Sequence, residues 1–165
     1  MTRLPRRIKL LLVVVAAQVV LLIGMAVLHG ARLADGTVVR VEVRPLDPLD
    51  PARGAYSDLS YPFQQLPVPS GAGDAYVLLE RPAEPNGVWR TTRVTDDQRD
   101  LQQADAWISL SRSNGALDVS PIGTYYASTE RSQALDEQLA ESGGVARLSL
   151  DEDGNPTLVD VMADD

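Results

Sequence analysis

A run of 19 residues without a charged side chain, Leu10 to Leu28, is the feature that most constrains how this chain can fold. At about 1.5 Å per residue, a helix of that length spans nearly the whole ~30 Å hydrocarbon layer of a bilayer. Four basic residues precede it: Arg3, Arg6, Arg7 and Lys9. Because basic residues favour the cytoplasmic side, we expect a cytoplasmic segment over residues 1–9, a single transmembrane anchor over residues 10–28, and everything that follows outside the cell membrane.

A cleaved signal peptide is the alternative interpretation of this segment, since Gly24, Met25 and Ala26 offer small residues at a suitable spacing for a cleavage site. The apolar run is longer than the roughly 7–15 residues of a signal-peptide core, which favours an uncleaved anchor in contact with the lipid bilayer. Under either interpretation the rest of the chain is exported, as a linker over residues 29–35 and a domain over residues 36–165.

The charge is divided unevenly along the chain. Residues 1–32 carry five basic and no acidic side chains, whereas the residues that follow carry ten arginines and 23 carboxylates, a net charge of −13 that leaves −8 overall. A domain this acidic repels phosphate backbones, so we expect no nucleic-acid partner. The chain has no cysteine, so the exported domain is held together by burial and not by disulfides.

The residue types also restrict the chemistry. The only histidine, His29, and the only lysine, Lys9, fall outside the exported domain, and cysteine is absent. A Ser-His-Asp triad or a Ser-Lys dyad would therefore lack its base there, and Cys/His zinc sites are excluded. No Gly-rich phosphate-binding motif is present. We expect no cofactor, no catalytic residue and no enzymatic activity.

Carboxylates are the chemistry that remains. In "DEDGNP", residues 151–156, Asp151, Asp153 and Asn155 alternate as calcium ligands do, but the twelfth loop position holds Met162 where a calcium loop needs Glu. The flanking apolar runs and the Asp-Gly pair predict a hairpin turn there instead. "TDDQRD", residues 95–100, predicts an exposed loop or a short helical turn. Paired carboxylates for glycoside hydrolysis stay open, because 23 acids offer many pairs.

Alternating apolar residues predict a series of short strands, as in "TVVRVEVRP", where Val39, Val41 and Val43 share one face. Further strands are expected at 75–82, 86–94, 105–113, 145–150 and 157–162, with an Asn-Gly turn at 114–115. One helix is expected after a cap at Ser128 or Thr129, ending at Gly143-Gly144, with an apolar stripe formed by Ala134, Leu135, Gln138 and Leu139. The fold class is therefore α+β: a mostly antiparallel β sheet, curled or sandwiched, with one packed helix and preceded by an N-terminal transmembrane helix.

"RGAYSDLSYPF", residues 53–63, contains three of the eight aromatic residues. In a strand, Ser57, Leu59 and Tyr61 would share one face and Tyr56 would lie on the other. Two interpretations are open. Either Gly54 supplies a special backbone angle while Tyr56 and Tyr61 pack with partnered hydroxyls, or the two tyrosines form a recognition surface.

The order of these segments resembles the bacterial membrane-anchored family named for its GDYxxLxY motif, whose members show a hydrophobic helix, a PxDP segment and then RGDYxxLxY. "RPLDPLDPARGAYSDLSY" follows that order, and "GTYYASTERSQALDEQL" and "LDEDGNPTLVDV" are similar to later family segments. The resemblance covers most of residues 36–162. The motif positions are matched by Gly54, Tyr56, Leu59 and Tyr61, with Arg53 matching the residue before them.

The sequence departs from the family pattern at two positions, with Ala55 where the family has Asp and Thr129 where an acidic residue is usual. If those acids did chemistry, this chain would lack it. The family has no established biochemical activity, and its members are often encoded beside polytopic membrane proteins. The resemblance therefore implies a polytopic membrane protein as partner.

Three hypotheses follow. The first is a single-pass membrane protein whose exported domain is a non-enzymatic accessory or binding partner of another membrane protein. The second is an exported carboxylate-dependent hydrolase or wall-active enzyme, and the third is a divalent-cation-responsive domain.

Overall fold

The computed structural model describes residues 15–25, 36–46 and 56–163, and the chain forms two compact units, residues 1–35 and residues 36–165. In the first unit, residues 15–25 are helical with exposed side chains. Across the described residues, we find no helix with both the length and the apolar character needed to cross a membrane. The other residues of the expected anchor, 10–14 and 26–28, lie outside the described residues, as do segment 1–9 and linker 29–35.

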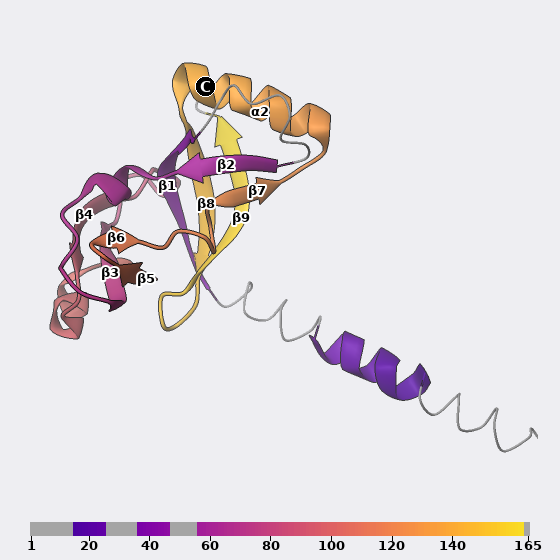
Figure 1. Cartoon of the computed structure of the whole chain (residues 1–165), viewed down its shortest axis with the longest axis horizontal. Helices are drawn as coiled ribbons and strands as arrows, with labels where there is room; N and C mark the ends of the chain where they lie inside the picture. The colour runs from indigo at the N-terminus through magenta and orange to yellow at the C-terminus, as the bar shows by residue number, and fades with distance from the viewer. Residues whose placement is uncertain (1–14, 26–35, 47–55, 164–165) are drawn as a thin grey trace, which may run out of the picture. The chain divides into compact units, whose positions relative to one another are not determined.

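The second unit contains a curled five-stranded sheet in the order β7-β2-β1-β8-β9, in which every pair of neighbouring strands is antiparallel. Strands β1, β8 and β9 run side by side, while β2 and β7 cross them at a steep angle (Figure 1). The strands are β1 (Thr37–Pro45), β2 (Tyr56–Ser60), β7 (Thr124–Tyr126), β8 (Gly144–Leu150) and β9 (Pro156–Ala163). The closing β8–β9 hairpin confirms the interpretation of "DEDGNP" as a turn.

A second, four-stranded antiparallel sheet has the order β4-β3-β5-β6. Its strands are β3 (Gly73–Glu80), β4 (Arg90–Thr95), β5 (Ala106–Ser113) and β6 (Ala116–Leu117). Two short 3-10 helices, η1 (Pro62–Gln65) and η2 (Gln98–Gln103), precede β3 and β5. The prediction of a β-rich, mostly antiparallel fold with curled sheets is therefore confirmed for the described residues of the second unit.

Strand β4 begins four residues later than the sequence predicts. Residues 86–89 form a connection and not a strand, because the Gly87 N–H turns back to the Glu84 carbonyl at 3.0 Å. Trp89 then donates its N–H to the Arg40 carbonyl of β1 at 2.7 Å. The connection is thus held by the other sheet, and it joins the two sheets at this point.

The turn between β8 and β9 forms a second junction between the sheets. The Ser109 N–H of β5 donates to the Gly154 carbonyl at 2.8 Å, and the Trp107 indole N–H donates to the Asp153 carbonyl at 3.2 Å. Gly154 has a φ of 80°, and a Cβ built there would lie 2.4 Å from Trp107 Nε1, so the close approach of the turn requires glycine.

Helix α2 (Thr129–Ser142) begins at Ser128, whose hydroxyl accepts the Arg131 N–H, and ends at Gly143, which has a φ of 74°. The predicted cap and end are confirmed, but the predicted apolar stripe is wrong in part. Leu135 and Leu139 are buried together with Ser132, whereas Ala134 and Gln138 are exposed. The buried positions are spaced by three and four residues, the narrow stripe that one helix face presents to a sheet.

The core is formed by the inward-facing side chains of both sheets. It includes Val39, Val41 and Val43 of β1, as the alternation predicts, and Ile108 and Leu110 of β5. Each of these side chains is at most 3% exposed. Burial of this kind is the main stabilising term for a domain without disulfides.

Candidate interaction surface

The motif stretch supplies strand β2 and the start of η1. Its side chains alternate between the core and the surface, so Leu59 and Tyr61 are each 2% exposed while Tyr56 is half-buried. The motif residues Arg53 and Gly54, together with Ala55, lie outside the described residues. The structure therefore brings together Leu59 and Tyr61 in the core and leaves Tyr56 on the opposite face of β2.

Tyr61 joins three parts of the domain. Its ring stacks on Phe63 with 5.0 Å between ring centroids, and its hydroxyl donates to the Ile122 carbonyl at 2.7 Å. The neighbouring Leu59 N–H donates to the Gly123 carbonyl at 2.7 Å. Burial raises the pKa of the Tyr61 hydroxyl well above its usual value, because the ionised form would lose its hydration. This is the arrangement that the packing interpretation describes, and it places Tyr61 out of reach of a surface partner.

Tyr56 belongs to a small aromatic pair at the end of the curled sheet. It lies opposite Tyr126 of β7, 6.2 Å away between ring centroids, and the Tyr126 side chain is 77% exposed. On the other face of β7, the Tyr125 hydroxyl donates to Asp160 Oδ1 at 3.0 Å. Partial burial and this hydrogen bond to the Asp160 carboxylate both raise the pKa of Tyr125.

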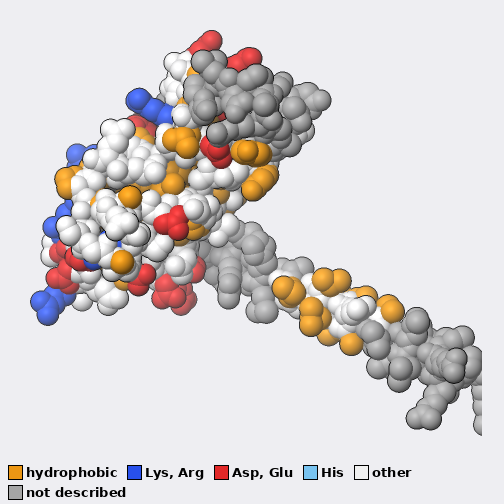
Figure 2. Space-filling view, in the orientation of Figure 1, with side chains coloured by type: hydrophobic (Ala, Val, Ile, Leu, Met, Phe, Trp, Pro, Cys, Tyr) orange, Lys and Arg blue, Asp and Glu red, His pale blue; other side chains and the backbone are white. Residues whose placement is uncertain are grey.

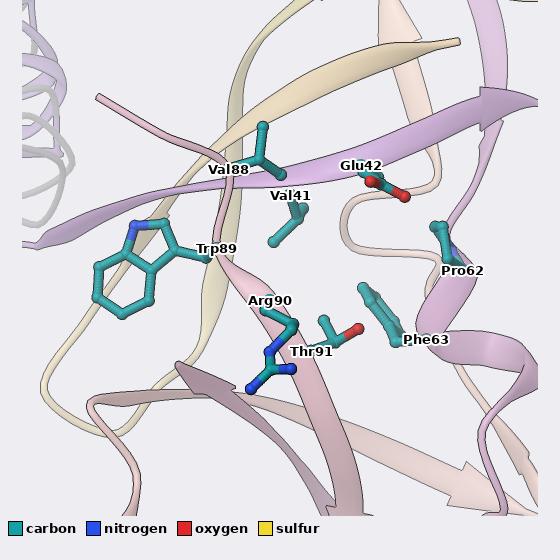
Figure 3. Close-up of a pocket in the computed structure, with 8 residues that line it drawn as sticks. All are labelled: Val41, Glu42, Pro62, Phe63, Val88, Trp89, Arg90 and Thr91. Carbon is teal, nitrogen blue, oxygen red and sulfur yellow. The ribbon is translucent and has the colours of Figure 1, made fainter. Parts of the chain in front are cut away.

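A recess opens directly after the motif, between β1 and the start of β4. Its volume is about 280 Å³. It is lined by Val41, Glu42, Pro62, Phe63, Val88, Trp89, Arg90 and Thr91. Val41 and Phe63 are each only 1% exposed and form its apolar floor. Figure 3 shows the Trp89 indole directed away from the side on which Pro62, Phe63 and Glu42 lie. We refer to these eight residues as the β1–β4 recess.

Two strand edges form the walls of the β1–β4 recess. One wall is the edge of β1 that faces away from β8. Along this edge, β1 pairs with β2 only at Arg44 and Pro45, and the Arg40 carbonyl accepts the Trp89 N–H. Peptide groups in an antiparallel strand point alternately to the two sides, so those of Glu42 point to the same side as those of Arg40 and Arg44. The facing wall is β4, the edge strand of the four-stranded sheet.

The charges around the β1–β4 recess are unequally matched. Arg90 forms an ion pair with Glu80 of β3, and its Nε donates to Glu80 Oε2 at 3.0 Å. Glu42 is exposed and has neither an ion pair nor a hydrogen bond to its carboxylate among the described residues. Figure 2 shows acidic and basic side chains interspersed over the region of the four-stranded sheet, so arginine charge there is offset by carboxylates. Glu42 is therefore the unmatched charge of the recess.

In the β8–β9 turn, the Asp151 carboxylate accepts hydrogen bonds from the turn itself. Asp151 Oδ1 accepts the N–H groups of Asp153 and Asn155 at 3.0 and 2.8 Å, and the Asn155 amide also donates to it. A smaller recess of about 130 Å³ beside Trp107 brings Asp151 near Asp105, whose carboxylate accepts the Arg81 N–H at 2.9 Å. Within the described residues, no group of three or more acidic, histidine or cysteine side chains has the arrangement needed to hold a metal ion.

Sequence reasoning missed the β1–β4 recess. The one local signal is the Asn86-Gly87 turn followed by two large apolar residues, Val88 and Trp89. That pattern predicts a strand that pairs with its predecessor, and only the folded chain shows that this segment lies against β1.

A family model described as "GDYXXLXY protein" matches residues 18–161, and the chain belongs to this family. No curated protein and no solved structure matches the chain.

Proposed function

We propose that this member of the GDYXXLXY family is a non-enzymatic accessory protein whose exported domain binds another membrane protein, one with several spans. The observation that carries the proposal is the β1–β4 recess, which combines an apolar floor, two strand edges and a single unmatched carboxylate. Concave surfaces with an apolar base and a few polar groups are typical of binding sites.

The proposal includes a single-pass anchor over residues 10–28, with residues 1–9 in the cytoplasm and the domain of residues 36–165 outside. It is supported by the uncharged run of 19 residues and the four basic residues that precede it. Residues 15–25, the described part of this run, are helical, and Figure 2 shows hydrophobic side chains along them.

Binding is favoured over catalysis by the distribution of carboxylates. A retaining or inverting glycosidase needs two carboxyl groups, roughly 5–10 Å apart, in one cleft. Glu42 is the only carboxylate that lines the β1–β4 recess. The recess beside Trp107 is lined by Asp105, Asp151 and Glu152, of which Asp105 and Asp151 accept backbone hydrogen bonds that hold these two carboxylates in structural roles. The same bonds weigh against the divalent-cation hypothesis.

Co-purification from native membranes tests the proposal. The full chain, carrying a C-terminal tag at native expression level, is extracted in a mild non-ionic detergent and analysed by mass spectrometry. We expect one polytopic membrane protein in near-stoichiometric amount, and we expect external protease to degrade the domain of residues 36–165 in intact cells. Recovery of the chain alone, or protection of that domain from external protease, would contradict the proposal.

A further inference from the structure

We propose that the β1–β4 recess is itself the docking site and that it binds an extended, basic and apolar segment of the partner protein. The segment is extended and pairs with the edge of β1 at Glu42. This inference rests on the proposed function and specifies its surface and the chemistry of its partner.

The main-chain geometry favours an extended ligand. The peptide groups of Glu42 point into the recess between two occupied positions of the same edge, Arg40, bonded to Trp89, and Arg44, paired with Ser60. No described strand pairs with β1 at Glu42 on this side. The open part of this edge is the N–H and C=O of Glu42, and an extended peptide that passes through the recess gains main-chain hydrogen bonds there, the interaction used in β-strand addition.

The floor of the recess selects an apolar side chain. Val41 and Phe63 present apolar surface at the base, and Val88, 39% exposed, extends that surface at the rim. Small-molecule pockets usually enclose about 300–1,000 Å³, so an open recess of about 280 Å³ fits one or two side chains of a longer segment better than an enclosed ligand. Alternate side chains of the added strand would point to this floor.

The carboxylate of Glu42 favours basic residues in the bound segment. Glu42 is unmatched among the described residues, while Arg90 is paired with Glu80. The exported residues carry a net charge of −13, which attracts a basic segment from a distance. A strand in which apolar and basic residues alternate therefore satisfies the floor and Glu42 together.

Defined peptides test this inference on the full chain in non-ionic detergent micelles. The probes are fluorescently labelled octapeptides of alternating valine and arginine, or alternating valine and glutamate, measured by anisotropy. We expect the Val/Arg peptide to bind at least tenfold more tightly than the Val/Glu peptide. We also expect methylation of every second peptide nitrogen to abolish binding of the Val/Arg peptide, because strand addition needs those N–H groups.

Two charge-reversal variants separate the recess from the overall charge. Glu42→Arg should weaken binding of the Val/Arg peptide about tenfold. Glu137→Arg changes the net charge by the same amount at an exposed residue of α2 that does not line the recess, and it should weaken that binding less than twofold. Equal effects of the two variants, binding that survives N-methylation, or no preference for the Val/Arg peptide would each overturn the inference.

The outcome is distinguishable from that of the proposed function. If the polytopic partner co-purifies equally with wild type and Glu42→Arg, the partner docks elsewhere and the inference fails while the proposed function stands. If sedimentation shows that the chain dimerises and that Glu42→Arg disrupts the dimer, the inference also fails, because the occupant of the recess would be a second copy of this chain and not a basic segment of another protein.

Discussion

Removing the Tyr61 hydroxyl tests whether the buried hydrogen bond from this motif tyrosine to Ile122 stabilises the domain. In Tyr61→Phe, the Ile122 carbonyl loses its 2.7 Å donor at a position where Ile122 is 0% exposed and water cannot easily replace it. Leaving a buried polar group without its partner costs about 1–3 kcal/mol, and we expect about 1–2 kcal/mol here because a carbonyl has a second lone pair. With an m-value of about 2 kcal/mol per M, the urea midpoint should fall by roughly 0.5–1 M.

Urea unfolding of the full chain in non-ionic micelles, followed by the fluorescence of Trp89 and Trp107, measures this change. Tyr56→Phe is the matched control, because Tyr56 belongs to the same motif but is only half-buried. We expect Tyr56→Phe to shift the midpoint by less than about 0.25 M. An unchanged midpoint for Tyr61→Phe, or equal shifts for the two variants, would refute the reasoning.

Alkaline pH provides an independent test of the same burial. Because burial raises the folded-state pKa of Tyr61 above its unfolded value of about 10, the unfolded chain loses this proton first. The contribution of Tyr61 is therefore complete below about pH 10 and falls as the pH rises further. The free energy of unfolding should decrease above pH 10 in the wild type, and less steeply in Tyr61→Phe. Parallel pH profiles for the two proteins would show that Tyr61 does not carry this dependence.

Two further perturbations follow from the packing. The hydrogen bond from buried Arg112 to Asp96 Oδ2, at 2.8 Å, lowers the pKa of Asp96, so its stabilisation is present above about pH 4 and is lost on further acidification. Asp96→Asn should lower the Tm at pH 7 and leave it near the wild-type value at pH 2; an equal loss at both pH values would contradict the pairing. Gly154→Ala should lower the free energy of unfolding by roughly 2–4 kcal/mol, because the new Cβ would overlap Trp107. Gly115→Ala is the control: Gly115 has a φ of 77° but open space around it, so the loss measured by urea unfolding should be about 1 kcal/mol.

Local patterns were sufficient for most of the strands. Strand β1 follows from strict alternation, and the turn after β5 follows from Asn114 and Gly115, which both adopt positive φ as a two-residue hairpin turn requires. The β8–β9 hairpin was predicted in the same way. These features depend on residues close in sequence, so the sequence pattern contains the information that determines them.

Features that depend on distant residues were not predictable. Trp89 bonds to Arg40, 49 positions earlier, and no periodicity in either segment indicates that contact. The β1–β4 recess is lined by residues of β1, η1 and the segment that leads into β4, so it too depends on how distant parts of the chain meet. Helix α2 illustrates a smaller difference: the periodicity located the helix, but the orientation that exposes Ala134 is determined by packing on the sheet.

Photo-crosslinking in living cells tests the central claim most directly. A photoreactive amino acid is placed at Val88, the exposed rim residue of the β1–β4 recess, or, as a control, at Glu137, an exposed residue of α2 that does not line the recess. We predict that Val88 becomes covalently joined to one polytopic membrane protein, through a segment of that protein rich in basic and apolar residues, and that Glu137 does not. Crosslinks from Val88 only to lipid or to scattered unrelated proteins would contradict a docking role for this domain.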